Sequence, residues 1–217
     1  MKPIWLIACA LILSSVAWSS SMAGEDKQPE REQALMRMRE LQRERKWQEF
    51  VDQFGVVDFA TWSVDSADKA VEAFHLRGQV YSILKNGKSA ETDLKAALKL
   101  APRNELIWLA LADNYANVLN DPTQALATYR HLFTLTGKSN GWLSIQVTIS
   151  TARILTDQVK PNEAIEVLNR YGEMEGMAPV WQVKMLRAYG HAYAAQGSEQ
   201  QAKDRFAKAL AIEQMGK

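Results

Sequence analysis

Apolar and small side chains recur along this chain at intervals of three and four residues, the spacing that places them on one face of a helix. The pattern returns at a fixed distance: Phe74 is followed 34 residues later by Trp108, and further copies begin at Thr148 and Leu186. Pairs of helices that recur at this interval are typical of a solenoid, in which each pair packs only on its neighbours. The sequence therefore predicts an all-α solenoid of about three to four helical hairpins.

Small residues mark where the two helices of each pair are expected to cross. Close crossing requires a residue without a bulky side chain on both helices, and large side chains fill the space beside it. A glycine inside a helix costs about 1 kcal/mol relative to alanine, so its presence indicates a tight contact. The predicted crossing residues are Gly78, Ala112, Ala152 and Gly190 on the first helices and Ala90, Ala125, Ala164 and Ala202 on the second.

The periodicity divides the chain into segments. Residues 71–217 are predicted to form the repeat array, and residues 30–55 a degenerate helical repeat at the N-terminus. A connector without a helical period is expected at 56–70, and a flexible polar segment at 24–29. No alternation long enough to indicate a strand is present.

Turn and cap residues separate the predicted helices. Asn86 and Gly87 suit a left-handed end of the helix that precedes them. Asp121 is followed by Pro122, the combination of a capping side chain and a proline at the first helical position. These residues place turns where the 34-residue period requires them.

The first 23 residues resemble a secretory signal peptide. Lys2 supplies a positive start, an apolar run of about 15 residues follows, and small residues precede a cleavage site before Gly24. The run is shorter than the roughly 20 residues that a membrane-spanning helix needs. Cys9 is the single cysteine, and its surroundings resemble a lipobox, so a lipid anchor at Cys9 or an uncleaved leader are alternatives. The sequence predicts a secreted or periplasmic protein, associated with the membrane only through one of those alternatives.

Charge disfavours two classes of partner. The chain has 26 lysine and arginine residues and 25 aspartate and glutamate residues. Lys2 is the one charge in the leader, so the mature chain is neutral. Nucleic acid and anionic membranes favour a basic surface, and neither is expected as the main partner.

The same set of large and small residues recurs in three of the predicted units. It consists of residues 74–81 (FHLRGQVY) with Ala90, Ala97 and Pro102, of Trp108, Leu111, Ala112 and Tyr115, and of Tyr189, Gly190, Tyr193, Ala202, Phe206 and Ala209. With these residues the unit resembles the tetratricopeptide repeat (TPR) family, which implies a right-handed TPR-like solenoid that binds protein or peptide partners. The third unit departs from the family pattern, because Thr151 and Leu155 stand where larger or aromatic residues are usual.

The resemblance also implies a concave groove lined by the first helices. Its C-terminal end is basic, so Arg153, Lys184 and Arg187 are candidates to bind an acidic group of a partner. Core packing is expected for Trp142 and Trp181. The predicted partner-binding residues are His75, Gln79, Ser82, Leu109, Asp113, Asn117, Arg153, Asp157, Lys184, Arg187 and His191.

No catalytic site, cofactor or metal is predicted. His75 and His191 lie three units apart, too far to share a metal, and the phosphate-loop and HExxH motifs are missing. The sequence favours a protein–protein interaction scaffold in the bacterial periplasm or cell envelope. Two alternatives stay open: a structural subunit or lipid-tethered assembly factor of an outer-membrane or secretion complex, and an enzyme or accessory domain acting on envelope polymer.

Overall fold

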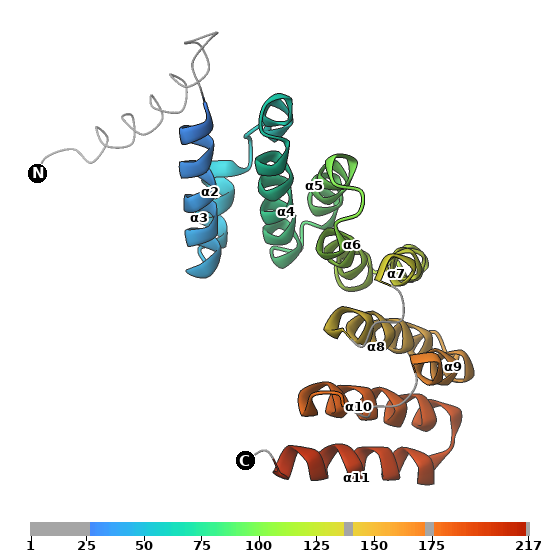
Figure 1. The fold of residues 1–217 in the computed structure, drawn as a ribbon. Helices are drawn as coiled ribbons and strands as arrows, with labels where there is room; N and C mark the ends of the chain where they lie inside the picture. The colour runs from blue at the N-terminus through green and yellow to red at the C-terminus, as the bar shows by residue number, and fades with distance from the viewer. Residues whose placement is uncertain (1–26, 137–140, 172–175, 216–217) are drawn as a thin grey trace, which may run out of the picture.

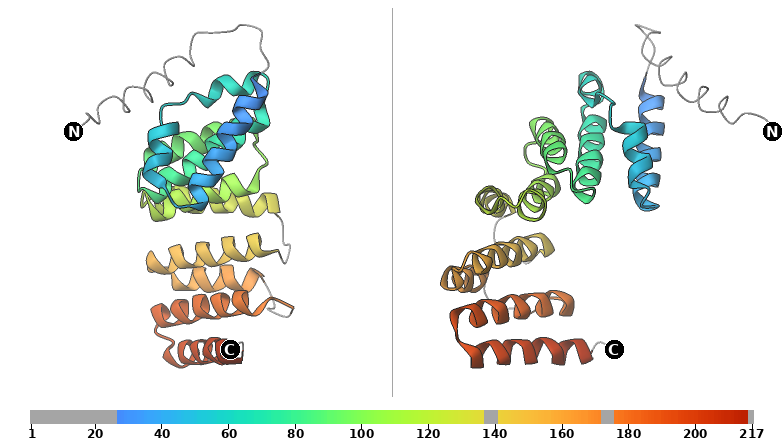
Figure 2. Two further views of the ribbon diagram at one scale, coloured as in Figure 1. Left: turned by 90° about the vertical axis from the view of Figure 1, so that its left-hand side faces the viewer. Right: turned by 180° about the vertical axis from the view of Figure 1, so that it is seen from behind.

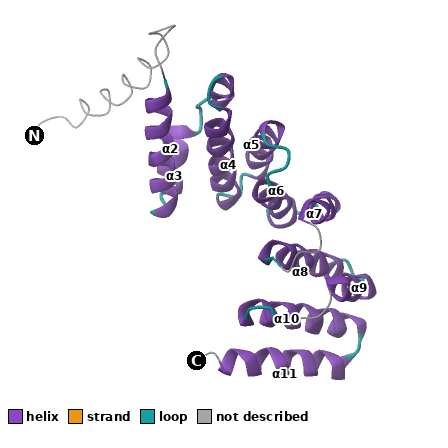
Figure 3. Ribbon diagram, viewed as in Figure 1, coloured by secondary structure: helices purple, strands orange, loops and turns teal. Residues whose placement is uncertain are grey.

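A computed structural model describes residues 27–136, 141–171 and 176–215, and the predicted signal peptide lies outside them. The described residues form α-helices and one 3-10 helix, with no strand (Figure 3). The elements are α2 (Gln28–Arg43), α3 (Trp47–Phe54), η2 (Phe59–Val64), α4 (Ala67–Ile83), α5 (Gly87–Leu100), α6 (Glu105–Asn117), α7 (Pro122–Thr136), α8 (Trp142–Asp157), α9 (Pro161–Tyr171), α10 (Pro179–Gln196) and α11 (Glu199–Met215).

Consecutive helices pair into hairpins that stack into an arc (Figure 1). We call α4–α5, α6–α7, α8–α9 and α10–α11 the first to fourth units, and α2–α3 the N-terminal pair. The first helices α4, α6, α8 and α10 lie on the inner side of the arc, and α5, α7 and α9 lie on the outer side. The reverse view shows the same curvature (Figure 2). The predicted all-α solenoid of helical hairpins is confirmed.

The crossing glycines lie against bulky side chains of the partner helix. A Cβ atom added at Gly78 would lie 2.9 Å from Leu94 Cγ, and one at Gly190 would lie 2.6 Å from Phe206 Cε1. Alanine occupies the corresponding places in the other units and is buried, as at Ala112. Small residues therefore set the distance between the helices of each unit.

Two details of the turn between α4 and α5 differ from the prediction. The left-handed residue is Lys85, with φ of 62°, and Gly87 is instead the first residue of α5. A Cβ at Gly87 would lie 2.7 Å from Leu119 Cδ2, so this glycine allows the next unit to pack closely. Glycine was expected here for its backbone freedom, and packing is the reason that the structure gives.

The predicted connector is shorter than expected. Residues 59–64 form the 3-10 helix η2, and α4 begins at Ala67 rather than after residue 70. Ala70 is fully buried, because this first turn of α4 packs on its neighbours. Likewise α2 begins at Gln28, within the segment expected to be flexible, and Gln28 Nε2 donates to the carbonyl of Asp65 at 2.9 Å.

Arg77 joins the N-terminal pair to the repeat array. Its guanidinium forms two hydrogen bonds with Asp93 of α5 and donates from Nη1 to the carbonyls of Phe54 and Val57. It also lies over the ring of Phe59, 4.4 Å from the centroid. The degenerate pair is thereby fixed to the first unit.

Candidate partner-binding groove

The inner surface of the arc is formed by the first helices of the four units (Figure 1). Each carries polar side chains on the face turned away from the second helices. The structure distributes the eleven predicted groove residues unequally: those of the first two units hydrogen-bond or pack within the chain, and those of the last two line one cavity.

In the first unit, the side chains of His75 and Gln79 form a hydrogen bond, and their two Nε2 atoms lie 3.0 Å apart. Gln42 of α2 donates to Gln79 Oε1 at 2.9 Å, so the N-terminal helix contacts this part of the groove. Burial lowers the pKa of His75 and favours its neutral form. The hydrogen bond between Gln42 and Gln79 therefore joins α2 to α4.

The middle of the groove is also bonded internally. Ser82 donates to Asn114 of the next unit at 3.0 Å, and Tyr129 donates to Asp113. Burial raises the pKa of Asp113, since it disfavours the charged carboxylate. The remaining members are Leu109, which packs against the core, and Asn117, which accepts from Arg153 Nη2 at 2.8 Å.

The third and fourth units enclose a cavity of about 470 Å³ between α8 and α10, which we call the inner cavity. All five groove residues predicted on these helices line it. Ile149, Thr156 and Ala188 complete the lining. Sequence reasoning missed these three, although Ile149 lies one helical turn before Arg153 and so shares its face. The predicted residues brought together are Arg153, Asp157, Lys184, Arg187 and His191.

The inner cavity carries more positive than negative side chains. Arg187 forms an ion pair with Glu213 at 2.9 Å, whereas the partner of Arg153 is the neutral amide of Asn117. Lys184 Nζ lies 4.4 Å from the ring centroid of Trp181. Lys184 has no carboxylate partner among residues 27–136, 141–171 and 176–215. Since Asp157 is the one acidic lining residue, the cavity favours an acidic ligand.

One of the two tryptophans expected in the core is not there. Trp142 is 49% exposed at the start of α8. Trp181 is half-buried and packs under Lys184, with which it forms a cation–π contact. Their positions before a predicted first helix did not distinguish a surface ring from a core ring.

The described part of the chain contains no group of three or more histidine, cysteine, aspartate or glutamate side chains placed to hold a metal ion. Among the described helices, none is both long enough and apolar enough to cross a membrane.

Comparison with known proteins identifies a family that matches part of the chain and solved structures with a similar fold. The tetratricopeptide repeat family matches residues 71–104, which cover the first unit except the first turn of α4, together with the turn that follows the unit. A putative kinesin light chain from Podosopora anserina, with nearly identical TPR-like repeats, has a TM-score of 0.69 and 16% identity, covering 86% of this chain and 96% of that one. MamA has a TM-score of 0.65 and 14% identity, covering 85% and 92%. No curated protein matches the chain.

A third similar structure is YrrB, described as a TPR protein with an unusual peptide-binding site; its TM-score is 0.60 at 17% identity, and the match covers 88% of each chain. At such identities the likeness shows the fold alone. Residues 71–104 and the architecture together support a TPR protein. Folds of this class generally serve as protein–protein interaction scaffolds rather than enzymes.

Proposed function

We propose that this protein is an exported scaffold that holds an extended, acidic segment of a partner protein in the concave groove, at the inner cavity. The observation that carries the proposal is the convergence of Arg153, Lys184, Arg187 and His191 on one cavity with an apolar floor. A positive rim over apolar side chains suits a peptide that offers carboxylates beside apolar groups. The peptide-binding site named for YrrB supports a peptide ligand.

The N-terminal groove residues contribute less to binding in this proposal. His75, Gln79 and Ser82 already have partners within the chain, and a ligand that displaced those partners would lose the hydrogen bonds they make. In the C-terminal half, by contrast, Arg153 bonds to the neutral amide of Asn117 and Lys184 lies over the ring of Trp181, so neither charge is balanced by a carboxylate among the described residues. We therefore place the partner's acidic residues over α8 and α10.

Charge reversal tests the proposed site. The probe is a labelled, capped twelve-residue peptide with alternating glutamate and leucine, measured by fluorescence anisotropy. Replacing Arg153 and Lys184 with glutamate should weaken its binding at low salt, and the difference from wild type should shrink at high salt because exposed charges are screened. In a matched control, Lys99 and Arg103 are replaced with glutamate; both residues are exposed and lie outside the inner cavity.

Equal affinity of the Arg153→Glu/Lys184→Glu protein and the wild type at low salt would contradict the proposed site. Loss of binding in the Lys99→Glu/Arg103→Glu control would show that total charge, rather than the inner cavity, controls the affinity. Circular dichroism of both double variants establishes that each is folded.

Export to the bacterial periplasm or cell envelope is the second part of the proposal, and the form of residues 1–23 supports it. Fusing these residues to a reporter enzyme that is active only after export should give activity in a bacterial host. Replacing two leucines of the apolar run with arginine should abolish that activity. N-terminal sequencing of the exported product should begin at Gly24, and retention of the leader or a lipid on Cys9 would favour a tethered protein.

A further inference from the structure

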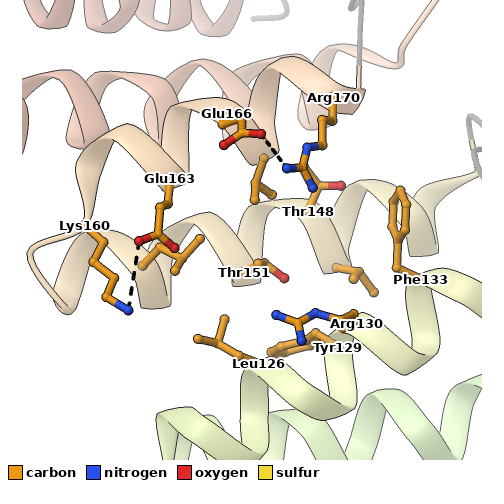
Figure 4. A pocket seen from close by; sticks show the side chains of 13 residues that line it. Leu126, Tyr129, Arg130, Phe133, Thr148, Thr151, Lys160, Glu163, Glu166 and Arg170 are labelled. Carbon is orange, nitrogen blue, oxygen red and sulfur yellow. Dashed lines mark hydrogen bonds and ion pairs between the residues drawn. The ribbon is translucent and has the colours of Figure 1, made fainter.

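The outer side of the arc has a cavity of its own, between the second and third units (Figure 4). It has a volume of about 340 Å³ and lies between α7 and α9, with α8 at its base. Thr148, Thr151 and Leu155 line the base, Leu126 and Arg130 come from α7, and Val167 comes from α9. We call it the outer cavity; it shares no lining residue with the inner cavity.

The other units show what fills the corresponding space. Tyr115 holds the place of Leu155 in the second unit, and its hydroxyl donates to Glu91 on the second helix of the preceding unit at 2.8 Å. Tyr189 holds the place of Thr151 in the fourth unit and donates to Asn169 on α9 at 3.0 Å. In each case an aromatic side chain spans the gap between adjacent units.

The first unit follows the same rule. Tyr81, in the place of Leu155, reaches the carbonyl of Gly55 at the end of α3, at 3.3 Å. In the third unit, neither Thr151 nor Leu155 is long enough to reach α7 in this way, and neither carries a ring. In the third unit, shorter side chains therefore hold the positions from which an aromatic side chain bridges to the neighbouring unit elsewhere in the array, and the rings of Tyr129 and Phe133 on α7 form part of the cavity wall.

The guanidinium of Arg130 lies beside the outer cavity. Lys95, five residues after the crossing residue Ala90, has its Nζ 5.9 Å from the ring centroid of Tyr115. Arg130 lies five residues after the equivalent Ala125 and is therefore the counterpart of Lys95. Arg130 is exposed at the cavity, and no hydrogen bond or ion pair joins it to another described residue. Guanidinium groups bind aromatic faces favourably.

The end of the cavity favours a ring without a hydroxyl group. The counterpart of Glu91, which accepts the Tyr115 hydroxyl, is Leu126. A tyrosine in the outer cavity would therefore place its hydroxyl near an apolar side chain, where an unpaired polar group is costly.

The charges at the rim favour an acidic neighbour for that ring. Lys160 pairs with Glu163, and Arg170 pairs with Glu166 (Figure 4). Within each pair the two charges cancel, so Arg130 is left as the lining cation without a partner among the described residues. A carboxylate beside the bound ring would supply the missing charge.

We propose that the outer cavity is a second docking site, which takes a phenylalanine side chain flanked by glutamate or aspartate from a partner protein. The ring enters between α7 and α9 and lies under Arg130, as Tyr115 lies under Lys95. The site lies on the opposite side of the arc from the concave groove, so the protein can hold two segments at once.

Methyl-labelled NMR with a defined peptide tests the site. The probe is acetyl-Gly-Ser-Glu-Phe-Glu-Gly-Ser-amide, and we expect saturable shifts of the methyl signals of Leu126, Val147 and Val167 that persist in the Arg153→Glu/Lys184→Glu protein, whose inner cavity is disabled. Replacing phenylalanine with alanine in the peptide should abolish the shifts, and replacing it with tyrosine should weaken them.

Two protein variants make the test specific. Leu155→Phe should fill the cavity from inside and abolish peptide binding while keeping the fold, since larger aromatic side chains occupy this place in other units. Arg130→Gln should weaken binding by about three- to fivefold through loss of the cation–π contact, and Arg103→Gln is its exposed control. If Leu155→Phe does not fold, Thr151→Leu fills the same space with the side chain found at Leu111 of the second unit.

Several results would overturn the proposal. These are an absence of shifts at millimolar peptide, shifts confined to Ile149 and Ala188, and undiminished binding by a folded cavity-filling variant. Concentration-dependent shifts without peptide, removed by Leu155→Phe, would assign the cavity to a second copy of the chain. The Arg153→Glu/Lys184→Glu protein should bind this peptide like wild type, so the two proposed sites fail or succeed separately.

Discussion

The contact between Arg77 and Asp93 gives the sharpest test of how the N-terminal pair is attached. Their side chains are only 10% and 6% exposed, and two hydrogen bonds of 2.7 and 2.9 Å join them. Arg77 Nη1 also donates to the carbonyls of Phe54 and Val57 at 2.9 and 2.6 Å. One guanidinium therefore links α4, α5 and the end of α3.

The expected free energies follow from which group loses its partner. Asp93→Leu leaves the guanidinium buried without a counter-charge and should cost about 3–5 kcal/mol. Arg77→Met leaves the carboxylate in the same state and also frees two carbonyls, at about 1 kcal/mol each, giving about 5–7 kcal/mol in total. The double variant buries no charge, so its loss should be several kcal/mol smaller than the sum of the two single losses.

Urea unfolding followed by circular dichroism measures the global stability of the four proteins. Because a repeat array can lose one end while the rest stays folded, cleavage by trypsin after Arg45 reports on the N-terminal pair separately. Arg45 is exposed and lies in the turn between α2 and α3. Strict additivity of the two single losses, or a loss below about 1 kcal/mol for Asp93→Leu, would refute the reasoning from a buried, mutually dependent pair.

Three further predictions follow from packing and charge. Gly190→Leu should cost about 3 kcal/mol or more by overpacking, because even a Cβ would lie 2.6 Å from a ring atom of α11; a thermal melt equal to wild type would show that α11 moves freely. A hydrogen bond from Lys95 lowers the pKa of Glu91 to about 2, so Glu91 stabilises the fold above pH 4.5 and that contribution disappears as the pH falls through about 2. Glu91→Gln should therefore melt lower than wild type at pH 7 but not at pH 2. Burial raises the pKa of Asp113, which makes its charged form unfavourable in the folded state, so Asp113→Asn should melt above wild type at pH 7. The difference should shrink as the pH falls below that raised pKa and vanish below the ordinary pKa of 3.8.

The fold could be predicted because the packing of a solenoid repeats. Gly78 and Gly190 occupy equivalent crossings, and each lies against a large side chain of its second helix. A residue needed for close helix packing must recur with the helices, so its spacing is visible in one sequence. The proline helix starts recur for the same reason: Pro122 begins α7 as expected, and Pro161 begins α9 in the same way.

The partners of polar side chains could not be predicted in this way. Which groups on the inner face bond across units depends on the angle between neighbouring hairpins, and the 34-residue period does not contain that angle. His75 and Gln79 therefore have the expected position, but the contact of Gln79 with Gln42 was not foreseen. Arg77 is a further example: nothing in the repeat pattern indicates that it reaches the end of α3.

The weakest repeat in the sequence is the one that gives the structure its two candidate sites. In a solenoid, every unit shows what a given position requires for packing, so a departure in one unit is measured against the others. Thr151 and Leu155 satisfy helix formation but leave open the space that Tyr115 and Tyr189 bridge in their units. On the other face of the same helix, Arg153 lines the inner cavity. Helix α8 thus borders the outer cavity on one side and carries charge on its inner side, as the two proposed sites require.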